Sequence, residues 1–303
     1  MPKALIYLLV FIAGFSFHFF FQHSSSESRI VQVRENSPEY HYINPLLYVD
    51  NSQSHFDELN SLRDEVEEYL NKEIIENKID RASFYYRDMN TGAWTGVRPD
   101  DKFVPGSMLK VAVLMTYLRL AEDNPDIMNQ SMYYKKNLNE KQNYPPQIEL
   151  VDGYYPVSRL LGQAIIESDN VAAATLSLPR EKEISELYIA LRFPPIPETH
   201  KDFLSTRDIS TIFRSLYSST YLLNSYSEQA LELLTQTKFD KGITQGVDPS
   251  IQVAHKFGEH TVYYEDKTIP TDFELHDCGI VYYPRNPYFV CVMTKGKSLA
   301  NLE

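Results

Sequence analysis

The chain has little of several features that mark common classes of protein. Its 303 residues include only two cysteines, and its eight histidines form neither a His-x-x-x-His pair nor a Cys/His cluster, so we expect no metal site. Its eleven glycines form no loop of the kind that holds a nucleotide phosphate, so we expect no cofactor. Long basic runs are absent and the formal net charge is −12. Nucleic acid is therefore not an expected partner.

One long apolar run is present, ALIYLLVFIAGFSFHFFF at 4–21, preceded by Lys3. Eighteen helical residues span roughly 27 Å, close to the hydrocarbon thickness of a bilayer. No small-x-small cleavage site follows, so residues 1–21 are predicted to be a membrane anchor or an uncleaved signal, with Lys3 inside. The expected location is the cytoplasmic membrane, with a single pass and the rest of the chain outside.

Residues 22–56 mix Ser, Asn, Pro and scattered charges, which predicts a tether with little regular structure. Further on, Cys278 and Cys291 flank a turn at 284–287. If that turn has two residues, position 278 faces 293, and the two cysteines lie diagonally about 7–8 Å apart. An exported protein with two cysteines invites a disulfide, but this separation favours two buried thiols.

Periodicity predicts an α+β fold for residues 57–303. Residues 59–75 form an amphipathic pattern, 82–97 read as a hairpin, and 105–122 are apolar on nearly every side, as in a buried helix. Further helices are predicted at 157–166, at 171–178 and, as two helices, within 205–234, with a proline-rich loop at 192–203; strands are predicted at 250–258, 274–284 and 288–296. We expect an antiparallel sheet built from both ends of this region, flanked by helices, with a helical lobe inserted at about 107–235.

Ser107 and Lys110 stand at the start of the buried helix and share one helical face. A serine hydroxyl needs a base within hydrogen-bond reach, and burial lowers the pKa of a lysine, so Lys110 could be that base. Composition alone predicts roughly one Ser-x-x-Lys in such a chain. Taken alone, the pair is better explained as a helix cap followed by a surface lysine.

Two further motifs follow in order. Ser168-Asp169-Asn170 lies between two predicted helices and has a chance expectation of about 0.08. Lys256-Phe257-Gly258 lies on a predicted strand and is common by chance. Ser-x-x-Lys, Ser-Asp-Asn and Lys-x-Gly, in a helix, a loop and a strand respectively, form a specific combination.

This combination resembles the serine β-lactamase and penicillin-binding protein superfamily, nearest to class A β-lactamases, from about residue 56 to the end. The resemblance implies that Ser107 is the acylated nucleophile, Lys110 its base, and Ser168 a proton relay. It also implies that Asn170 binds the substrate amide, with Phe257, Gly258 and Glu259 lining the substrate site. Lys256 would supply positive charge and hold Ser168. The backbone N–H groups of Ser107 and Glu259 would form the oxyanion hole, and Asp169 would tie the lobes together.

The sequence also departs from this family. The family motif has Thr or Ser between Lys and Gly, where this chain has Phe257, and many class A enzymes have an arginine where Cys278 stands. Class A enzymes carry a Glu and an Asn in an Ω-loop, and the Glu orients the water that frees the acyl-enzyme. Here the loop offers only Glu198, which fits a solvated loop carboxylate better than a catalytic one. The terminal helix that the superfamily packs on its sheet has only KSLANLE in its place.

Other polar residues are weaker candidates. His255 precedes Lys256 on a strand and should point to the opposite face. His276 and Asp277 could line the cleft.

Three functions remain open. The first is a membrane-tethered serine hydrolase that opens β-lactams through a Ser107 acyl-enzyme. The second is a D-alanyl-D-alanine peptidase acting on peptidoglycan stem peptides. The third is a penicillin-binding sensor that is acylated once and not turned over. All three require the side chains of residues 107, 168 and 256 to meet in one cleft.

Overall fold

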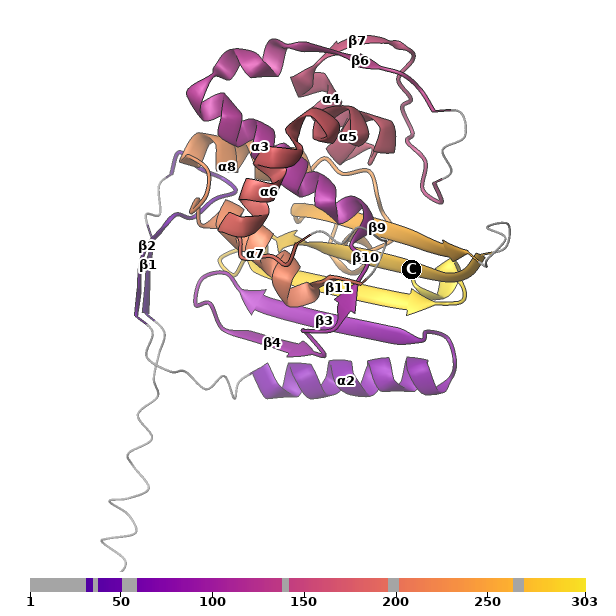
Figure 1. Ribbon diagram of the computed structural model, residues 1–303. Helices are drawn as coiled ribbons and strands as arrows, with labels where there is room; N and C mark the ends of the chain where they lie inside the picture. Colours follow the sequence, from indigo (N-terminus) through magenta and orange to yellow (C-terminus); the bar gives the residue numbers. More distant parts are fainter. Residues whose placement is uncertain (1–30, 35–37, 51–58, 138–141, 196–201, 264–269) are drawn as a thin grey trace, which may run out of the picture.

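A computed structural model describes residues 31–34, 38–50, 59–137, 142–195, 202–263 and 270–303 (Figure 1). Its centre is a five-stranded antiparallel sheet with the order β4-β3-β11-β10-β9. The strands are β3 (Arg81–Asp88), β4 (Trp94–Val97), β9 (Val253–Tyr263), β10 (Pro270–Val281) and β11 (Tyr288–Gly296). Because β3 pairs with β11, the two ends of the domain meet in the middle of the sheet, as the sequence predicts.

The hairpin of β10 and β11 corrects the prediction for the cysteines. Val281 pairs with Tyr288, so the connecting loop has six residues, 282–287, instead of two. This shift in register places Cys278 directly opposite Cys291, with their Cα atoms 4.0 Å apart. The two cysteines form a disulfide, so the expectation of two buried thiols was wrong.

One helix precedes the sheet in the sequence, and the other helices lie between its second and third strands along the chain. The bounds are α2 (Asn60–Ile75), α3 (Lys110–Asp123), α4 (Val157–Ile166), α5 (Asn170–Ser177), α6 (Glu181–Ala190), α7 (Thr206–Tyr217) and α8 (Asn224–Leu234). Short 3₁₀ turns are η2 (Gly106–Leu109), η3 (Pro125–Asn129), η4 (Leu178–Arg180), η5 (Ile243–Gly246) and η6 (Leu299–Asn301). Two small ribbons pair β5 (Lys102–Phe103) with β8 (Leu204–Ser205), and β6 (Ser131–Tyr134) with β7 (Gly153–Pro156). The sequence reading missed α6 and both ribbons.

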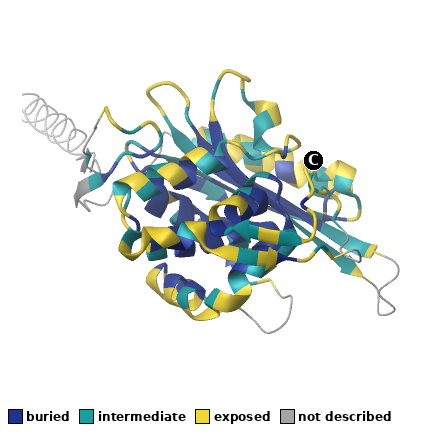
Figure 2. Ribbon diagram, turned by 90° about the horizontal axis from the view of Figure 1, so that it is seen from above, coloured by how far each residue is buried: buried dark blue, intermediate teal, exposed yellow. Residues whose placement is uncertain are grey.

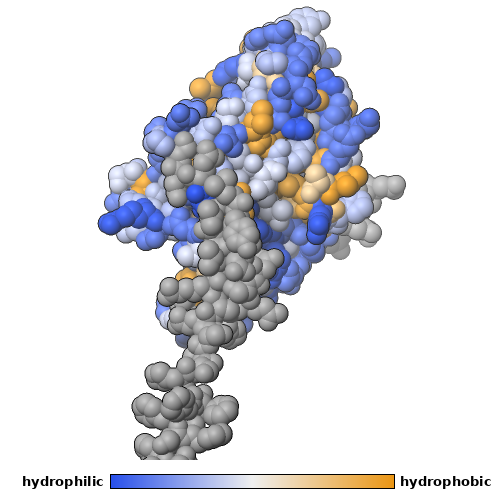
Figure 3. Space-filling model, turned by 90° about the vertical axis from the view of Figure 1, so that its left-hand side faces the viewer, coloured by the Kyte–Doolittle hydropathy of each residue, from blue (hydrophilic) through white to orange (hydrophobic). Residues whose placement is uncertain are grey.

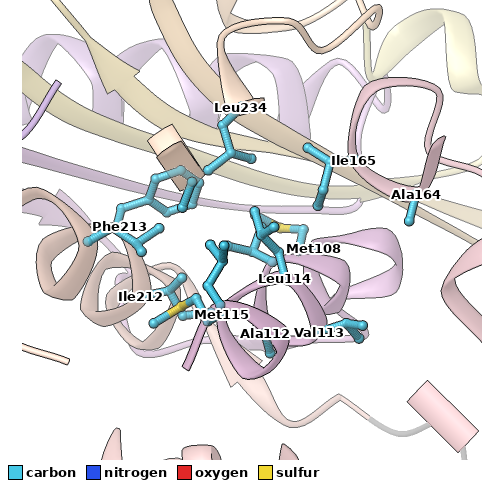
Figure 4. Close-up of a cluster of buried hydrophobic side chains, with 14 of the residues drawn as sticks. Met108, Ala112, Val113, Leu114, Met115, Ala164, Ile165, Ile212, Phe213 and Leu234 are labelled. Atoms are coloured by element: carbon cyan, nitrogen blue, oxygen red, sulfur yellow. The ribbon is translucent and has the colours of Figure 1, made fainter. Parts of the chain in front are cut away.

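The main core surrounds α3, as its apolar sequence predicts. Ten of its fourteen residues are buried, and Figure 4 shows its side chains packed against residues of α4, α7 and α8. The other wall of this core is the inner face of the sheet, which includes Tyr85, Phe289 and Met293. Burying each such large apolar side chain stabilises the fold by about 1.5–3 kcal/mol. The buried residues in Figure 2 accordingly concentrate along the central strands and the helix above them.

The outer face of the sheet is covered by two smaller clusters. Along α2, Leu70 packs with Phe84 and Val97 of β3 and β4. Over β9 and β10, a second cluster joins Phe239, Phe257 and Leu275, with Tyr144, Leu299 and Leu302 against it. The 3₁₀ turn η6 thus lies where the resemblance led us to expect a terminal helix.

The segment predicted to be an irregular tether contains ordered structure. Within it, β1 (Val31–Arg34) pairs with β2 (Leu46–Asp50). Between these strands the backbone N–H groups of residues 41, 42 and 43 donate to the carboxylate of Glu228 on α8. Ile43 is buried in the main core. Figure 3 views the molecule from this side, where the described surface is mostly hydrophilic with small apolar patches.

The proposed anchor, residues 1–21, lies outside the described residues. Among the helices that the structure describes, none has both the length and the apolar character needed to cross a membrane.

Candidate active site

Ser107 lies in η2, immediately before α3, and Lys110 is the first residue of α3. The Nζ of Lys110 is 2.8 Å from Ser107 Oγ, so the predicted pair is in contact. The same Nζ lies 2.5 Å from the carbonyl oxygen of Ser168 and 2.6 Å from Asn170 Oδ1. A neutral amine can donate its two hydrogens to these oxygens and offer its lone pair to the hydroxyl of Ser107.

Ser168 lies between α4 and α5 and joins the two lysines. Its backbone has a φ of 56°, in the left-handed region that a serine seldom adopts, and such strain is typical of functional loops. Its Oγ is 3.2 Å from Lys110 Nζ and 2.8 Å from Lys256 Nζ. The structure therefore brings Ser107, Lys110, Ser168, Asn170 and Lys256 together from a 3₁₀ turn, two helices, a loop and a strand.

The two amines are almost entirely removed from water. Lys256 is 0% exposed and Lys110 is 6% exposed. Burial, and next the positive charge of Lys110, lower the pKa of Lys256 well below its usual value. Its Nζ is held 2.8 Å from the hydroxyl oxygen of Ser168 and 3.1 Å from the carbonyl oxygen of Phe257.

Two glycines allow the backbone around Ser107 to touch β9. Gly106 has a φ of 54°, and a side-chain carbon there would lie 2.4 Å from the carbonyl oxygen of Glu259. A side-chain carbon at Gly258 would lie 2.2 Å from the carbonyl oxygen of Pro105. This close approach is the arrangement in which the N–H groups of residues 107 and 259 can serve a single oxyanion.

Phe257 stands where the family motif has a hydroxyl, and its ring packs against other side chains. One face of its ring lies against Lys256 Nζ, 4.1 Å from the ring centroid, and the ring also stacks on Phe239. Tyr144 meets the ring edge-on. In place of a hydroxyl, the chain therefore has an apolar wall that shields the amine of Lys256 from solvent.

Comparison with family models identifies the chain. Residues 65–303, which are most of the sequence and include every element of the central sheet, match the model described as the β-lactamase enzyme family. The protein belongs to the β-lactamase enzyme family. Its five-stranded sheet and helical region are the fold of that family, as the sequence predicts.

Solved structures of β-lactamase fold agree with this assignment. A mutant of PBP-A, solved as an acyl-enzyme complex with penicillin G, has a TM-score of 0.64 and 18% identity, covering 78% of this chain and 88% of its own. A class A β-lactamase from Mycobacterium abscessus has a TM-score of 0.62 and 20% identity, covering 75% and 88%. A β-lactamase from Xanthomonas campestris pv. campestris has a TM-score of 0.63 and 16% identity, covering 78% and 90%. Comparison with curated protein sequences gives no match.

In this β-lactamase family member a segment that we call the strap, residues 142–148, contacts both the loop that carries Ser168 and strand β9. At the loop, Gln142 Nε2 donates to the carbonyl oxygen of Ser168 at 3.1 Å. At β9, the backbone N–H of Asn143 donates to Glu259 Oε1 at 3.1 Å, and its side-chain amide also donates to the Glu259 carboxylate. Farther along, the N–H of Gln147 donates to Glu167 Oε2 at 2.8 Å. The strap therefore crosses from the Ser168 loop to β9.

Sequence reasoning missed the strap because its residues follow no periodicity and their partners lie far away in the chain. A cavity of about 210 Å³ lies beside it, lined by Asn143, Tyr144, Phe257 and other residues. Ser107 and Lys110 do not line this cavity.

The remaining candidates are placed as follows. Glu198 lies outside the described residues. His255 is buried on the opposite face from Lys256, as predicted, and its Nδ1 is 3.0 Å from the carboxylate of Asp277. His276 is also buried, but on the inner face beneath the residues before Ser107. Neither His276 nor Asp277 lines the cleft. Among the described residues, no cluster of His, Cys, Asp or Glu could hold a metal ion.

Asp169 ties together parts of the helical region rather than the two lobes. Its Oδ1 accepts the N–H of Ala172 at 2.9 Å and so caps α5, while Oδ2 accepts the hydroxyl of Tyr134 at 3.0 Å. This carboxylate fixes the loop that presents Ser168 and Asn170.

Proposed function

We propose that the protein is a serine hydrolase that opens β-lactams by forming an acyl-enzyme on Ser107. The observation that supports this most directly is the unbroken chain of contacts from Ser107 through Lys110 and Ser168 to Lys256. Such a network supplies the two proton transfers that acylation needs, one from the nucleophile and one to the leaving nitrogen.

In the proposed mechanism, Lys110 accepts the proton of the Ser107 hydroxyl as Oγ forms a bond to the carbonyl carbon. The negative charge that develops on the carbonyl oxygen is stabilised by the N–H groups of residues 107 and 259. As the carbon–nitrogen bond breaks, Ser168 gives its proton to the leaving nitrogen and is reprotonated from the lysines. Asn170 binds the substrate amide, and the backbone of residues 257–259 forms the edge of the site.

The sequence provides fewer candidate residues for hydrolysis of the acyl-enzyme than for its formation. The loop that follows the Ser-Asp-Asn motif in the sequence contains Glu198 but no Glu-x-x-x-Asn pair. This favours slow release of the acyl group, which would make a D-alanyl-D-alanine peptidase or a non-turnover penicillin sensor the second candidate. The likeness of the fold to PBP-A supports the same alternative.

A chromogenic cephalosporin separates these functions. Many equivalents of product per protein support β-lactam hydrolysis. One equivalent, with stable labelling of Ser107, supports a peptidase or a sensor, and a D-Ala-D-Ala peptide assay then divides those two. Ser107→Ala should abolish labelling, and Lys110→Ala should slow it by on the order of 10² to 10⁴, the usual contribution of a positioned base. Absence of labelling in the parent protein contradicts all three readings.

We further propose that residues 4–21 hold the domain at the outer surface of the cytoplasmic membrane. The support is the length and apolar character of that run. The full chain should sediment with membranes, and its domain should be open to protease added outside the cell. A chain lacking residues 4–21 should remain in the soluble fraction, and equal partition of the two chains would contradict the proposal.

A further inference from the structure

Both backbone polar groups of Val104, three residues before Ser107, are bound by side chains of a single strand, β10. The N–H of Val104 donates to Glu274 Oε2 at 2.9 Å, and its carbonyl oxygen lies 3.0 Å from His276 Nε2. Glu274 is 0% exposed and His276 1% exposed. Only Pro105 and Gly106 separate this point from the nucleophile, so these two bonds fix where the chain enters the turn that carries Ser107.

The hydrogen bonds also determine where the proton of His276 lies. The N–H of Thr294 on β11 donates to His276 Nδ1 at 3.3 Å, so Nδ1 accepts and Nε2 must carry the hydrogen that reaches Val104. Both ring nitrogens of His276 are thus used, one to hold Val104 and the other to accept from β11.

Within the part of the chain that the structure describes, two charged side chains lie beside His276. Glu274 lies on its own strand, 3.6 Å from Nε2, and Lys295 on β11 lies 3.4 Å from the other oxygen of Glu274. On the remaining side the ring of Phe103 meets the imidazole edge-on. The pair is thus enclosed between the sheet and the segment that leads to Ser107.

We propose that Glu274 and His276 are positioning residues for Ser107. By holding the N–H and the carbonyl oxygen of Val104, they keep both the hydroxyl and the backbone N–H of Ser107 directed at one reacting carbonyl. Neither side chain touches the reacting atoms, and their effect passes through the backbone of residues 104–106. The proposal rests on the proposed function, because it concerns the rate at which Ser107 is acylated.

The opposite face of the sheet provides a matched control. His255 on β9 and Asp277 on β10 are likewise a buried histidine and carboxylate, and they are in contact at 3.0 Å. Asp277, however, binds the N–H of Ile243 at 2.9 Å, on the side away from Ser107. Changes to this outer pair should cost stability without moving the nucleophile.

The test compares Glu274→Gln, His276→Gln and His276→Ala with the control variants His255→Gln and Asp277→Asn. Stopped-flow measurement with a chromogenic cephalosporin separates the acylation rate constant from the initial binding constant, and thermal melting records stability. We expect His276→Ala to slow acylation by about ten- to a hundred-fold with little change in binding, because small misplacements of a nucleophile have effects of that order. Glu274→Gln should slow it by about ten-fold.

His276→Gln distinguishes positioning from general stability. Glutamine can donate to Val104 and accept from Thr294. This variant should keep the parent acylation rate, whereas His276→Ala should not. Both outer-face variants should melt at lower temperature, and His255→Gln should be acylated at the parent rate.

A measurement without substrate supports the same test. Hydrogen exchange at the Val104 amide should be faster in Glu274→Gln than in Asp277→Asn. Parent-like acylation and exchange in all inner-face variants would overturn the inference and leave the proposed function standing. Absence of acylation in the parent protein would overturn the proposed function, and with it the catalytic meaning of these contacts.

Discussion

At the scale of single residues, the site combines the amines of Lys110 and Lys256 with the hydroxyls of Ser107 and Ser168. All four residues are buried. Lys110 and Lys256 both reach the oxygen of Ser168. Two charges so close, away from solvent, repel each other strongly. The site is therefore most stable when at most one of the two lysine amines is protonated. Acylation also requires an unprotonated amine as the base.

This arrangement predicts a pH dependence of both rate and stability. Burial and then Lys110 lower the pKa of Lys256, so between that lowered value and the ordinary lysine value near 10.4 the unfolded chain binds a proton that the folded protein does not. The free energy of unfolding should therefore rise with pH across this window, and fall as the pH is lowered through it. Acylation should slow once the pH falls below the lowered pKa.

Lys256→Met tests this dependence. Denaturant titrations at several pH values should show a smaller pH slope for Lys256→Met than for the parent protein. Lys182→Met, a change at an exposed lysine, should keep the parent slope. An identical slope in all three proteins would show that Lys256 is charged in the folded state.

Phe257 predicts a gain of function. Phe257→Thr restores the hydroxyl that the family motif has at this place, and a hydrogen bond to a charged carboxylate stabilises by about 1.5–3 kcal/mol. Acylation by a penicillin should become about ten-fold faster, while thermal stability falls because the stack on Phe239 is lost. Phe239→Leu removes the same stack without supplying a hydroxyl, so its stability should fall with no gain in rate. Equal rates for both variants would contradict this account.

At the scale of secondary-structure elements, the sequence predicted what repeats locally. The apolar periodicity of α3 and α4 and the alternation around the turn after β3 depend on residues close in the chain. The spacing of Ser107 and Lys110 was enough to place them on one face. These features follow from local geometry, whereas the meeting of the three motifs was expected from the family resemblance.

What the sequence could not predict depends on distant partners or on loop length. The strap has no periodicity, and Asn143 meets Glu259 across 116 positions of sequence. The disulfide was missed because a two-residue turn and a six-residue loop give registers that differ by two positions. The contacts of Glu274 and His276 with Val104 could be predicted only by knowing that β10 passes beneath Val104.

The strap predicts a size-dependent rate. Asn143→Ala removes the side-chain contacts to Glu259 and Thr261 but keeps the backbone N–H. Because the strap joins the Ser168 loop to β9, loosening it should speed acylation by β-lactams with bulky side chains, by about ten-fold, more than acylation by small ones. Gln147→Ala, an exposed position whose backbone N–H still binds Glu167, should change neither rate. A uniform effect on all β-lactams would contradict a role in size selection.

At the scale of the whole molecule, the folded unit begins well before α2. Residues 41–43 direct three backbone N–H groups at the carboxylate of Glu228, and the hydroxyl of Tyr282 donates to the carbonyl oxygen of Tyr42. Hydrogen bonds to a charged group stabilise more than neutral ones. Residues 41–43 are thus part of the domain.

Glu228→Ala should lower the free energy of unfolding by about 2–3 kcal/mol, because each peptide N–H loses a charged acceptor. Glu232→Ala, one turn farther along the same helix and exposed, should change it by less than about 0.5 kcal/mol. Chemical denaturation of both variants measures the difference. Equal stability of the two would show that residues 41–43 do not depend on α8.

The bond between Cys278 and Cys291 has a practical consequence. Both sulfur-bearing residues are 0% exposed, with Met108 of the nucleophile turn above Cys278. A thiol reductant can reach them only in chains that have opened the space between sheet and helix. In a reducing buffer, the rate at which Cys278 and Cys291 become available to an alkylating reagent therefore reports how often the catalytic core opens. This measurement needs no substrate.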